Sequence, residues 1–341
     1  MEPLTAQALA PLTTLRLGGP AERMVEARTE EEVVAAVREA PEPLLVLAGG
    51  SNVVVADEGF PGTVVRVLTR GVERDGERLE VQAGEPWEPL VAACVAQGLQ
   101  GFECLSGIPG STGATPIQNV GAYGQEVAET VESVRVLDRA TGRVEEMPAA
   151  ACGFRYRSSV FRHHDRRTVL AVTFRLREDA RSGPIRYVEL ARRLGVPVGA
   201  AAPLADVREA VLALRRGKGM VVDPEDPDSV SAGSFFTNPI LEAKAFAALE
   251  ARAAPDRPPA FPEPDGRIKT SAAWLIERSG FARGYGDGRV GISSKHTLAL
   301  VNRGGGTTAE LMALAREIAA GVQQRFGVAL APEPVLVGHR W

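Results

Sequence analysis

The sequence predicts an α+β protein with more than one domain. Its 341 residues are enough for about two domains of roughly 150 residues each. The first half alternates short β-branched runs with Gly, Pro and Asp, whereas the second half carries longer segments with helical periodicity. Hydrophobic residues make up 45% and charged residues 24%, a composition typical of globular chains that excludes wholesale disorder.

Local signals place the elements of the first half. A helix is predicted over residues 29–40, because Thr29 and Glu32 have the spacing of a capping box. A second helix is expected over residues 87–97. Short apolar runs between turn residues predict strands over residues 44–48, 53–55, 64–67, 79–83, 131–138 and 169–176.

Helical periodicity is stronger in the second half. Residues 206–216 carry apolar side chains on one face, and Thr307 and Glu310 form a capping box that opens a long helix over residues 307–326. Further helices are expected over residues 241–251 and 271–279, and strands over residues 290–292, 298–301 and 334–337. The proline-rich stretch 253–266 is expected to be a surface loop.

Charge and cysteine content exclude several classes of protein. The net charge of −4 lacks the basic footprint of a nucleic-acid binder. The three cysteines form no CxxC motif and the four histidines form no HExxH motif, so we expect no metal site, no disulfide framework and a reducing compartment. Because the sequence has no signal peptide and no run of 18 apolar residues, we expect a cytoplasmic protein without membrane contact. The sequence does not indicate protein partners.

Two glycine-rich stretches are candidates for ligand binding, although neither a GxGxxG nor a GxxxxGK[ST] motif is present. The first, residues 49–52, follows a predicted strand and reads GGSN. Glycines let backbone N–H groups approach an anion closely, and Ser51 and Asn52 add side-chain donors. The same four residues are also good turn chemistry, so a plain hairpin turn remains open.

The second stretch, residues 106–124, is long, rich in small residues and without helical or strand periodicity. Long loops of this kind are often functional. Small residues let a flat ring lie against the backbone, and the amides of Gln118 and Asn119 suit the polar edge of a heterocycle. A packed Ω-loop without a ligand is the alternative.

Taken together, several blocks resemble the UDP-N-acetylenolpyruvoylglucosamine reductase (MurB) family. The blocks are GGSN at 49–52 with GFPG at 59–62, GFECLSGIPGSTGATPIQNVGAYGQEV at 101–127, CGFRYRSSVF at 152–161, SAGSFFTNP at 231–239 and KTSAAWLIE at 269–277. Residues 298–304 and the Pro332-Glu333 pair continue the match. The blocks occur in the family's order over most of the chain.

The resemblance implies an N-terminal FAD-binding domain of the vanillyl-alcohol-oxidase (PCMH) type and a C-terminal α/β substrate-binding domain. It divides the chain into residues 1–217 for FAD binding (two α+β lobes, core about 17–178), 218–326 for the substrate, and 327–341 as a segment returning toward the flavin. It implies noncovalent FAD, with NADPH as hydride donor, and cofactor contacts from Gly49, Gly50, Ser51, Asn52, Ile108, Pro109, Gly110, Ser111, Gly113, Ala114, Gln118, Asn119, Gly121 and Ala122.

The implied activity is reduction of UDP-N-acetylglucosamine enolpyruvate to UDP-N-acetylmuramate in peptidoglycan synthesis. The family's catalytic residues fall on Arg157, Ser234 and Glu333. A fixed guanidinium suits charge that develops on the substrate carboxylate, a serine would donate a proton to C2, and the glutamate would bind the carboxylate or orient Arg157. Judged singly, the three could instead be a surface ion pair, a turn cap and a solvated carboxylate.

The implied substrate contacts are Tyr156, Tyr187, Lys218, Asn238 and His296, where many members of the family carry glutamine at the last position. The stretch 221–230 is an insertion relative to the family pattern. Two other classes stay open. One is a flavoprotein oxidase, and many such oxidases attach FAD covalently through a His or Cys side chain. The other is a noncatalytic binder of flavin or sugar nucleotide. The flavin loops hold no histidine, and Cys104 is their only nearby thiol.

Overall fold

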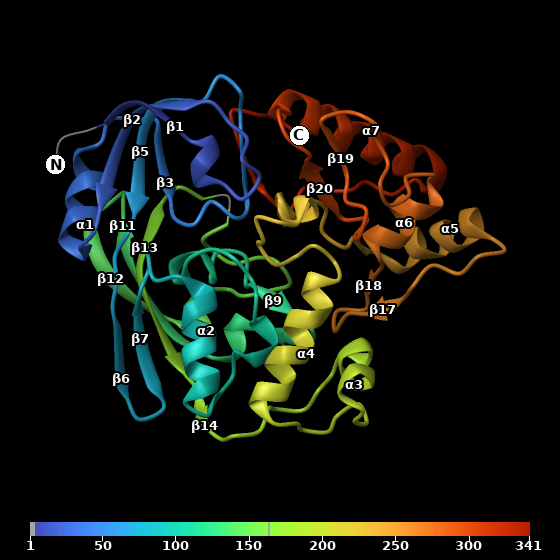
Figure 1. Ribbon diagram of the computed structural model, residues 1–341, viewed down its shortest axis with the longest axis horizontal. Coiled ribbons are helices and arrows are strands. Elements are labelled where there is room, and N and C mark those ends of the chain that lie inside the picture. The colour runs from blue at the N-terminus through green and yellow to red at the C-terminus, as the bar shows by residue number, and fades with distance from the viewer. Residues whose placement is uncertain (1–3, 163) are drawn as a thin grey trace. The chain divides into compact units, whose positions relative to one another are not determined.

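The computed structural model describes residues 4–162 and 164–341 (Figure 1). The chain forms two compact units. The first contains the residues up to Gln7, Ala21–Gly50 and Phe60–Val221, and the second contains Ala8–Pro20, Ser51–Gly59 and Val222–Trp341. Two short segments of the N-terminal sequence therefore belong to the second unit. The domain boundaries expected from the resemblance remain a proposal.

The first unit contains a four-stranded sheet in the order β1-β2-β5-β3. Strands β2 and β3 both run parallel to β5, and helix α1 packs against β5. The expected capping box is confirmed, because Thr29 and Glu32 exchange hydrogen bonds at the start of α1. The elements are β1 (Leu4–Ala8), β2 (Pro20–Ala27), α1 (Glu30–Glu39), β3 (Leu44–Leu47) and β5 (Phe60–Val67).

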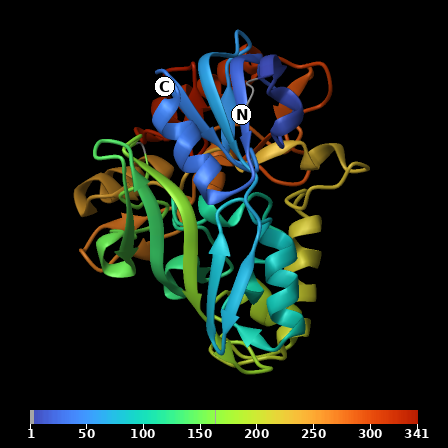
Figure 2. The same cartoon turned by 90° about the vertical axis from the view of Figure 1, so that its left-hand side faces the viewer.

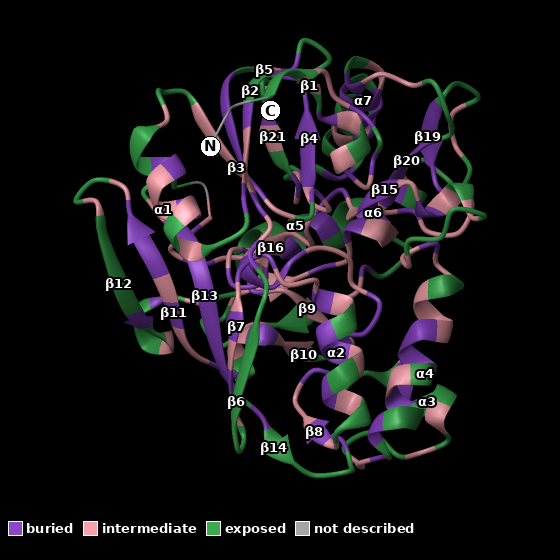
Figure 3. Ribbon diagram, turned by 60° about the vertical axis from the view of Figure 1, so that its left-hand side comes forward, coloured by how far each residue is buried: buried purple, intermediate pink, exposed green. Residues whose placement is uncertain are grey.

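A second, antiparallel sheet of the first unit has the order β12-β11-β13-β7-β6. Its middle strand β13 is almost wholly buried, whereas the edge strands β12 and β6 are exposed (Figure 3). Trp87 opens helix α2, and its ring packs against Phe102 and Phe174, with centroids 4.8 and 6.0 Å away. The elements are β6 (Val72–Asp75), β7 (Arg78–Gln82), α2 (Trp87–Ala96), β11 (Val131–Asp138), β12 (Arg143–Pro148) and β13 (Arg167–Arg175).

Helices α3 and α4 complete the first unit and pack against each other (Figure 1). Apolar residues of both helices enclose the buried Cys104, so this thiol is part of a hydrophobic core. Helix α3, which the sequence analysis did not predict, ends at Gly195 with φ +68°. The elements are β8 (Leu99–Gln100), β9 (Gly121–Ala122), β10 (Gln125–Glu126), β14 (Arg177–Glu178), α3 (Val188–Leu194) and α4 (Leu204–Arg216). Figure 2 shows the β6–β7 hairpin of this unit from the side.

The second unit is built on three helices and three small sheets, in the orders β15-β20-β19, β16-β18-β17 and β21-β4. The capping box of Thr307 and Glu310 opens α7 as expected. The elements are β4 (Val53–Val55), β15 (Ser231–Ser234), β16 (Ile240–Leu241), α5 (Ala243–Ala253), β17 (Phe261–Pro262), β18 (Ile268–Lys269), α6 (Ala272–Arg278), β19 (Val290–Ile292), β20 (Ala299–Asn302), α7 (Thr308–Phe326) and β21 (Val335–Val337).

One expectation about this unit needs correction. The proline-rich stretch is largely an exposed loop, but Phe261 and Pro262 form the edge strand β17, which pairs with β18. Proline lacks a donor and is therefore tolerated at a sheet edge, where its missing N–H costs no ladder bond. Short 3-10 turns complete the description: Ala10–Leu12, Glu103–Leu105, Thr112–Ala114, Val127–Glu129, Ala149–Ala151 and Pro227–Ser229. No helix in the described ranges combines the length and apolarity needed to cross a bilayer.

Candidate active site

The two glycine loops singled out in the sequence meet in the first unit. A Cβ atom on Gly49 would lie 2.6 Å from the Cα atom of Gly110, so only glycine at position 49 allows this approach. Gly50 and Gly110 have φ +59° and +117°, where side chains are disfavoured. The GG turn and the small-residue loop therefore lie against each other, and this contact is made by backbone.

These loops suit the phosphate groups of a dinucleotide. Among the hydrogen bonds of the described residues, the backbone N–H groups of Gly50, Gly110 and Ser111 donate to no protein acceptor. Gly50 and Ser111 are buried. Buried N–H groups nearly always have a partner, and N–H groups on tight glycine turns bind anions. The residues present thus fit an anionic ligand at this place.

The side chain of Asn119 is hydrogen-bonded within the chain. Its Nδ2 donates to Glu126 Oε2 at 2.7 Å and to the Arg155 carbonyl at 3.2 Å, and its Oδ1 accepts from the Ala128 N–H at 3.1 Å. The amide therefore fixes the shape of the loop. The contact of Asn119 with a cofactor stays a prediction.

Several non-glycine residues in or near the second loop have a left-handed backbone conformation, with positive φ. Asn119, Tyr123 and Arg157 have φ of 44°, 50° and 48°, and they are three of the five described non-glycine residues with positive φ. A tyrosine or arginine in this region costs about 1–3 kcal/mol and persists only where the surroundings enforce it. Strain of this kind is typical of functional sites.

Arg157 is held against the loop. Its Nη2 donates to the Gly121 carbonyl oxygen at 2.7 Å, and its guanidinium lies 5.2 Å from the ring centre of Tyr156. Arg162 Nη1 donates to the Arg157 carbonyl at 2.6 Å, which fixes the backbone as well. The predicted catalytic arginine therefore has a fixed position beside the predicted flavin loop.

Two predicted substrate residues are brought together through a third that the sequence analysis did not assign. Lys218 Nζ lies 2.6 Å from Glu189 Oε2 and 5.6 Å from the ring centre of Tyr123. The Tyr123 ring packs edge-on against Tyr187, with centroids 5.3 Å apart. Burial raises the pKa of Tyr123 to about 12, so its hydroxyl stays neutral. Tyr123 could have been singled out from the sequence, because it is the tyrosine of the GAYG segment of the loop.

In the second unit, three predicted residues lie on neighbouring segments. Ser234 on β15 pairs with Ala299 on β20. The next carbonyl, that of Phe235, accepts from the Glu333 N–H at 2.8 Å. His296 Nδ1 accepts from the Leu298 N–H at 3.1 Å. Backbone pairing thus gathers Ser234, His296 and Glu333 from positions far apart in the sequence.

Asn238 also lies in this unit. Its Oδ1 accepts from the Ala272 N–H at 3.0 Å, at the start of helix α6. The carbonyl half of the amide is therefore structural, as at a helix cap. Its NH₂ group makes no hydrogen bond within the described residues and is the half of the amide proposed to contact a substrate.

Comparison with known proteins agrees with this arrangement. Residues 225–337 match the family described as UDP-N-acetylenolpyruvoylglucosamine reductase, C-terminal domain, and residues 21–147 match a FAD binding domain. The UDP-N-acetylenolpyruvoylglucosamine reductase of Thermobifida fusca (strain YX) is 58% identical over 97% of this chain and 96% of its own length. This chain belongs to the UDP-N-acetylenolpyruvoylglucosamine reductase family. The resemblance read from the sequence is therefore confirmed.

Other relatives support the same assignment. The UDP-N-acetylenolpyruvoylglucosamine reductase of Streptomyces coelicolor (strain ATCC BAA-471 / A3(2) / M145) is 56% identical over 97% of this chain and 89% of its own. The crystal structure of the MurB reductase from Thermus caldophilus matches with a TM-score of 0.66 at 26% identity, covering 98% of both chains. The predicted fold, an FAD-binding domain followed by a MurB C-terminal domain, is confirmed.

The stretch 221–230, expected to be an insertion, contacts the turn that carries His296. The Asp228 carboxylate accepts from the Ser294 N–H at 2.8 Å and from its hydroxyl at 2.6 Å. Asp226 Oδ1 lies 2.8 Å from Lys295 Nζ, and this hydrogen bond raises the pKa of Lys295. The stretch is thereby attached to this turn, a connection for which the sequence offered no signal.

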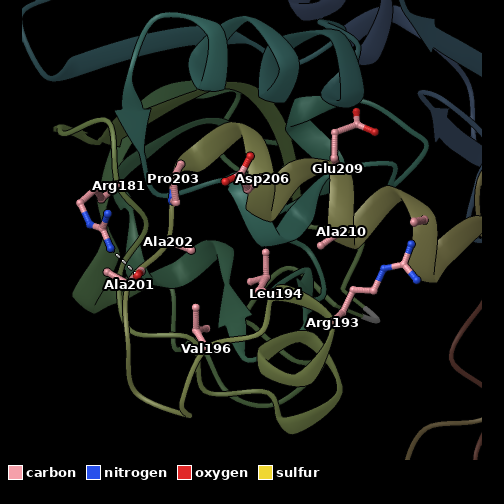
Figure 4. Close-up of a pocket in the computed structure, with 11 residues that line it drawn as sticks. Arg181, Arg193, Leu194, Val196, Ala201, Ala202, Pro203, Asp206, Glu209 and Ala210 are labelled. Carbon is pink, nitrogen blue, oxygen red and sulfur yellow. Dashed lines mark hydrogen bonds between the residues drawn. The ribbon is translucent and has the colours of Figure 1, made fainter.

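A cavity of about 600 Å³ lies elsewhere, between α3 and α4 (Figure 4). Arg181, one of the residues that line it, donates to the Ala201 carbonyl at 2.6 Å. None of the predicted site residues lines this cavity, so it carries no argument about the reaction. Among the described residues, no group of His, Cys, Asp and Glu side chains is placed to hold a metal ion.

Proposed function

We propose that this chain uses NADPH to reduce UDP-N-acetylglucosamine enolpyruvate to UDP-N-acetylmuramate, the reaction that its relatives' name describes. The observation that carries the proposal is the Arg157 guanidinium fixed to the Gly121 carbonyl of the predicted flavin loop. When bound, FAD supplies the hydride chemistry, accepting hydride from NADPH and delivering it to C3 of the enolpyruvyl group. The side chains of this protein supply charge stabilisation and the proton.

Arg157 is assigned to the substrate carboxylate. Negative charge spreads onto this group as hydride reaches C3, and a guanidinium already fixed in place stabilises it without reorganisation. Its planar fork matches both oxygens of a carboxylate. The hydrogen bond to Gly121 and the stacking on Tyr156 limit the orientations that this fork can adopt.

Ser234 is assigned to proton delivery at C2. Hydride at C3 and a proton at C2 complete the saturated lactyl group, so one proton donor is required. Its position on β15, one residue before the carbonyl that binds the Glu333 N–H, supports a shared role for the two side chains. Glu333 would hydrogen-bond the substrate carboxylate or orient the arginine.

The remaining residues are assigned to binding. Substrate contacts are proposed for Tyr156, Tyr187, Lys218, Asn238 and His296, and cofactor contacts for the residues of 49–52 and 108–122 named above. Residues 1–217 are assigned to FAD binding and 218–326 to substrate binding, which the two matched family regions support. The three cysteines are free and buried, in keeping with a cytoplasmic enzyme.

One spectroscopic experiment tests the proposal. Anaerobic NADPH should bleach the flavin band of the purified protein, and UDP-N-acetylglucosamine enolpyruvate should restore it. NADPH should reduce the flavin more efficiently than NADH, with Arg216 and Lys218 as candidate partners of the extra phosphate. Steady-state double-reciprocal plots should be parallel, because NADPH and the sugar nucleotide would react with the enzyme in turn, in two separate half-reactions. Bleaching without reoxidation by the sugar nucleotide would overturn the substrate assignment.

A further inference from the structure

Gly107 directly precedes the predicted flavin loop, residues 108–122, and Glu88 binds it. One carboxylate oxygen of Glu88, Oε2, accepts from the Gly107 backbone N–H. The other, Oε1, accepts from Arg208 Nη2 at 2.5 Å. Glu88 belongs to α2 and Arg208 to α4, two helices that lie side by side (Figure 1). One carboxylate therefore connects both helices to the residue that precedes the loop.

Helix α4 also covers the other face of Gly107. A Cβ atom here would lie 2.9 Å from Leu212 Cδ2 and 3.3 Å from Arg215 Nε. Arg215 is itself fixed, since its Nη2 donates to the Met220 carbonyl at 2.6 Å, and burial lowers its pKa. The backbone of Gly107, at φ +76°, is thus enclosed between Glu88 and the side chains of α4.

The far end of the loop is contacted by the segment that follows α4. Tyr123 follows the loop, and its ring lies under Lys218, two residues beyond the end of α4. Contacts therefore flank residues 108–122 on both sides, although neither contact touches the residues assigned to FAD. Fixing the ends of a loop lowers the entropy that it loses when a ligand binds.

We propose that Glu88 is a positioning residue for FAD, which acts by fixing Gly107 so that the loop 108–122 is preorganised for the cofactor. A carboxylate is needed because it must accept two hydrogen bonds at once, one from a cation and one from a backbone N–H. An amide at the same place has one acceptor oxygen and must give up one of the two partners. Hydrogen bonds to charged groups contribute about 1.5–3 kcal/mol each, about tenfold or more in a binding constant.

Glu88→Gln tests this in the full-length holoenzyme. FAD release on dilution is followed by the recovery of free-flavin fluorescence, which yields the dissociation constant without NADPH or sugar nucleotide. We expect the constant to rise about tenfold. Hydrogen exchange at the Gly107 amide should accelerate, whereas the loss of an unconnected surface charge would leave it unchanged.

Glu85→Gln is the matched control. Glu85 lies three residues earlier, and its Oε2 accepts from the Gly71 N–H at 3.0 Å, outside the flavin loop. One amide oxygen can keep this bond, so the same change removes a carboxylate charge without releasing Gly107. FAD affinity in this variant should stay within about twofold of wild type, well inside the tenfold effect expected from a charged hydrogen bond. Equal weakening in both variants, or unchanged affinity in folded Glu88→Gln, would overturn the proposal.

A second variant decides the matter if Glu88→Gln does not fold. Arg208→Gln keeps the Glu88 carboxylate and removes only its cationic partner, so FAD affinity should fall about threefold or more. Unchanged affinity in this variant would then refute the positioning role. Because only FAD binding is measured, failure here is separate from failure of the proposed roles of Arg157 and Ser234.

Discussion

Arg157 donates a 2.7 Å hydrogen bond from Nη2 to the carbonyl oxygen of Gly121, a residue 36 positions earlier in the chain. A Cβ atom on Gly121 would lie 3.0 Å from Arg157 Nη1 and 2.9 Å from Glu126 Cγ, so a larger residue there would displace the guanidinium or its neighbour. The Arg157 guanidinium, which is assigned to the substrate, and the loop 108–122, which is assigned to the cofactor, therefore fix each other's position.

Arg157→Lys should slow reoxidation of the reduced enzyme by the sugar nucleotide about 10²–10³-fold, the typical effect of removing a transition-state donor. Lysine keeps the positive charge and must adopt the same positive φ at position 157, but it lacks the planar guanidinium that can bind both carboxylate oxygens. Stopped-flow absorbance measures both half-reactions, and reduction by NADPH should change little. Arg155→Lys is the control, since Arg155 is exposed two residues away. Near-normal reoxidation in Arg157→Lys would remove Arg157 from the mechanism.

Ser234→Ala should retain FAD and be reduced by NADPH at near-normal speed, because flavin reduction needs no proton at C2. Its reoxidation by the sugar nucleotide should fall about 10²–10⁴-fold, the usual contribution of general acid catalysis. Ser234→Cys should recover part of the rate, since a thiol also donates a proton. Stopped-flow reoxidation within about threefold of wild type would place the proton donor elsewhere.

Ser231→Ala is the matched control for this serine. Ser231 lies on the same strand, and its Oγ accepts from the Gly233 N–H at 3.2 Å, the behaviour of a purely structural serine. This variant should lower the thermal midpoint and leave the reoxidation rate of the folded enzyme unchanged. Slow reoxidation in both variants would indicate a general disturbance of β15 instead of a lost proton donor.

Acid precipitation of the yellow protein should leave a colourless pellet and release the flavin. Burial raises the pKa of the Cys104 thiol, the cysteine nearest the flavin loop in sequence, and thus suppresses the thiolate that covalent attachment requires. Burial likewise raises the pKa of Cys94 to about 12 and that of Cys152 to about 11. Cys104→Ala should still bind FAD. Flavin that stays with the precipitate would favour the covalent flavoprotein oxidases.

Asp57→Asn should destabilise the protein at neutral pH. Both carboxylate oxygens of Asp57 accept backbone N–H groups at the start of α7, from Thr308 and Ala309, each at 2.8 Å. Burial raises the pKa of Asp57, but these hydrogen bonds outweigh it and lower the pKa below that of the unfolded chain. The stabilisation that ionised Asp57 gives the folded protein is therefore fully present above about pH 4, near the pKa of Asp57 in the unfolded chain. It is lost as the pH falls through the lower pKa that Asp57 has in the folded protein.

Thermal unfolding checks this dependence. At pH 7 the midpoint of Asp57→Asn should fall by about 1–3 °C, the size expected for a partly exposed helix cap in which asparagine replaces one of two acceptors. The gap between the two proteins should narrow at pH 3. A midpoint equal to wild type at pH 7, or a gap that stays constant down to pH 3, would contradict the assignment.

Elements that depend on neighbours in sequence were predicted well. The helices that begin at Thr29 and Thr307 are capped by residues three positions away, and periodicity gave α4 within two residues. Helix α3 was missed because it has only seven residues and lacks a side-chain cap. Strand β17 was missed because prolines signal a loop, whereas a sheet edge tolerates them.

The sequence by itself determined the family, the helix caps, and the identity of the two glycine loops and of the three proposed catalytic residues. Only the tertiary structure decided how these parts are held: Gly107 by Glu88, Tyr123 by Lys218, and helix α7 by Asp57. Caps and periodicity reflect contacts between residues three or four positions apart, which any window of sequence contains. Contacts across tens or hundreds of residues depend on which surfaces pack together, so the partner of Glu88 or of Asp57 is defined only after packing has brought the two together.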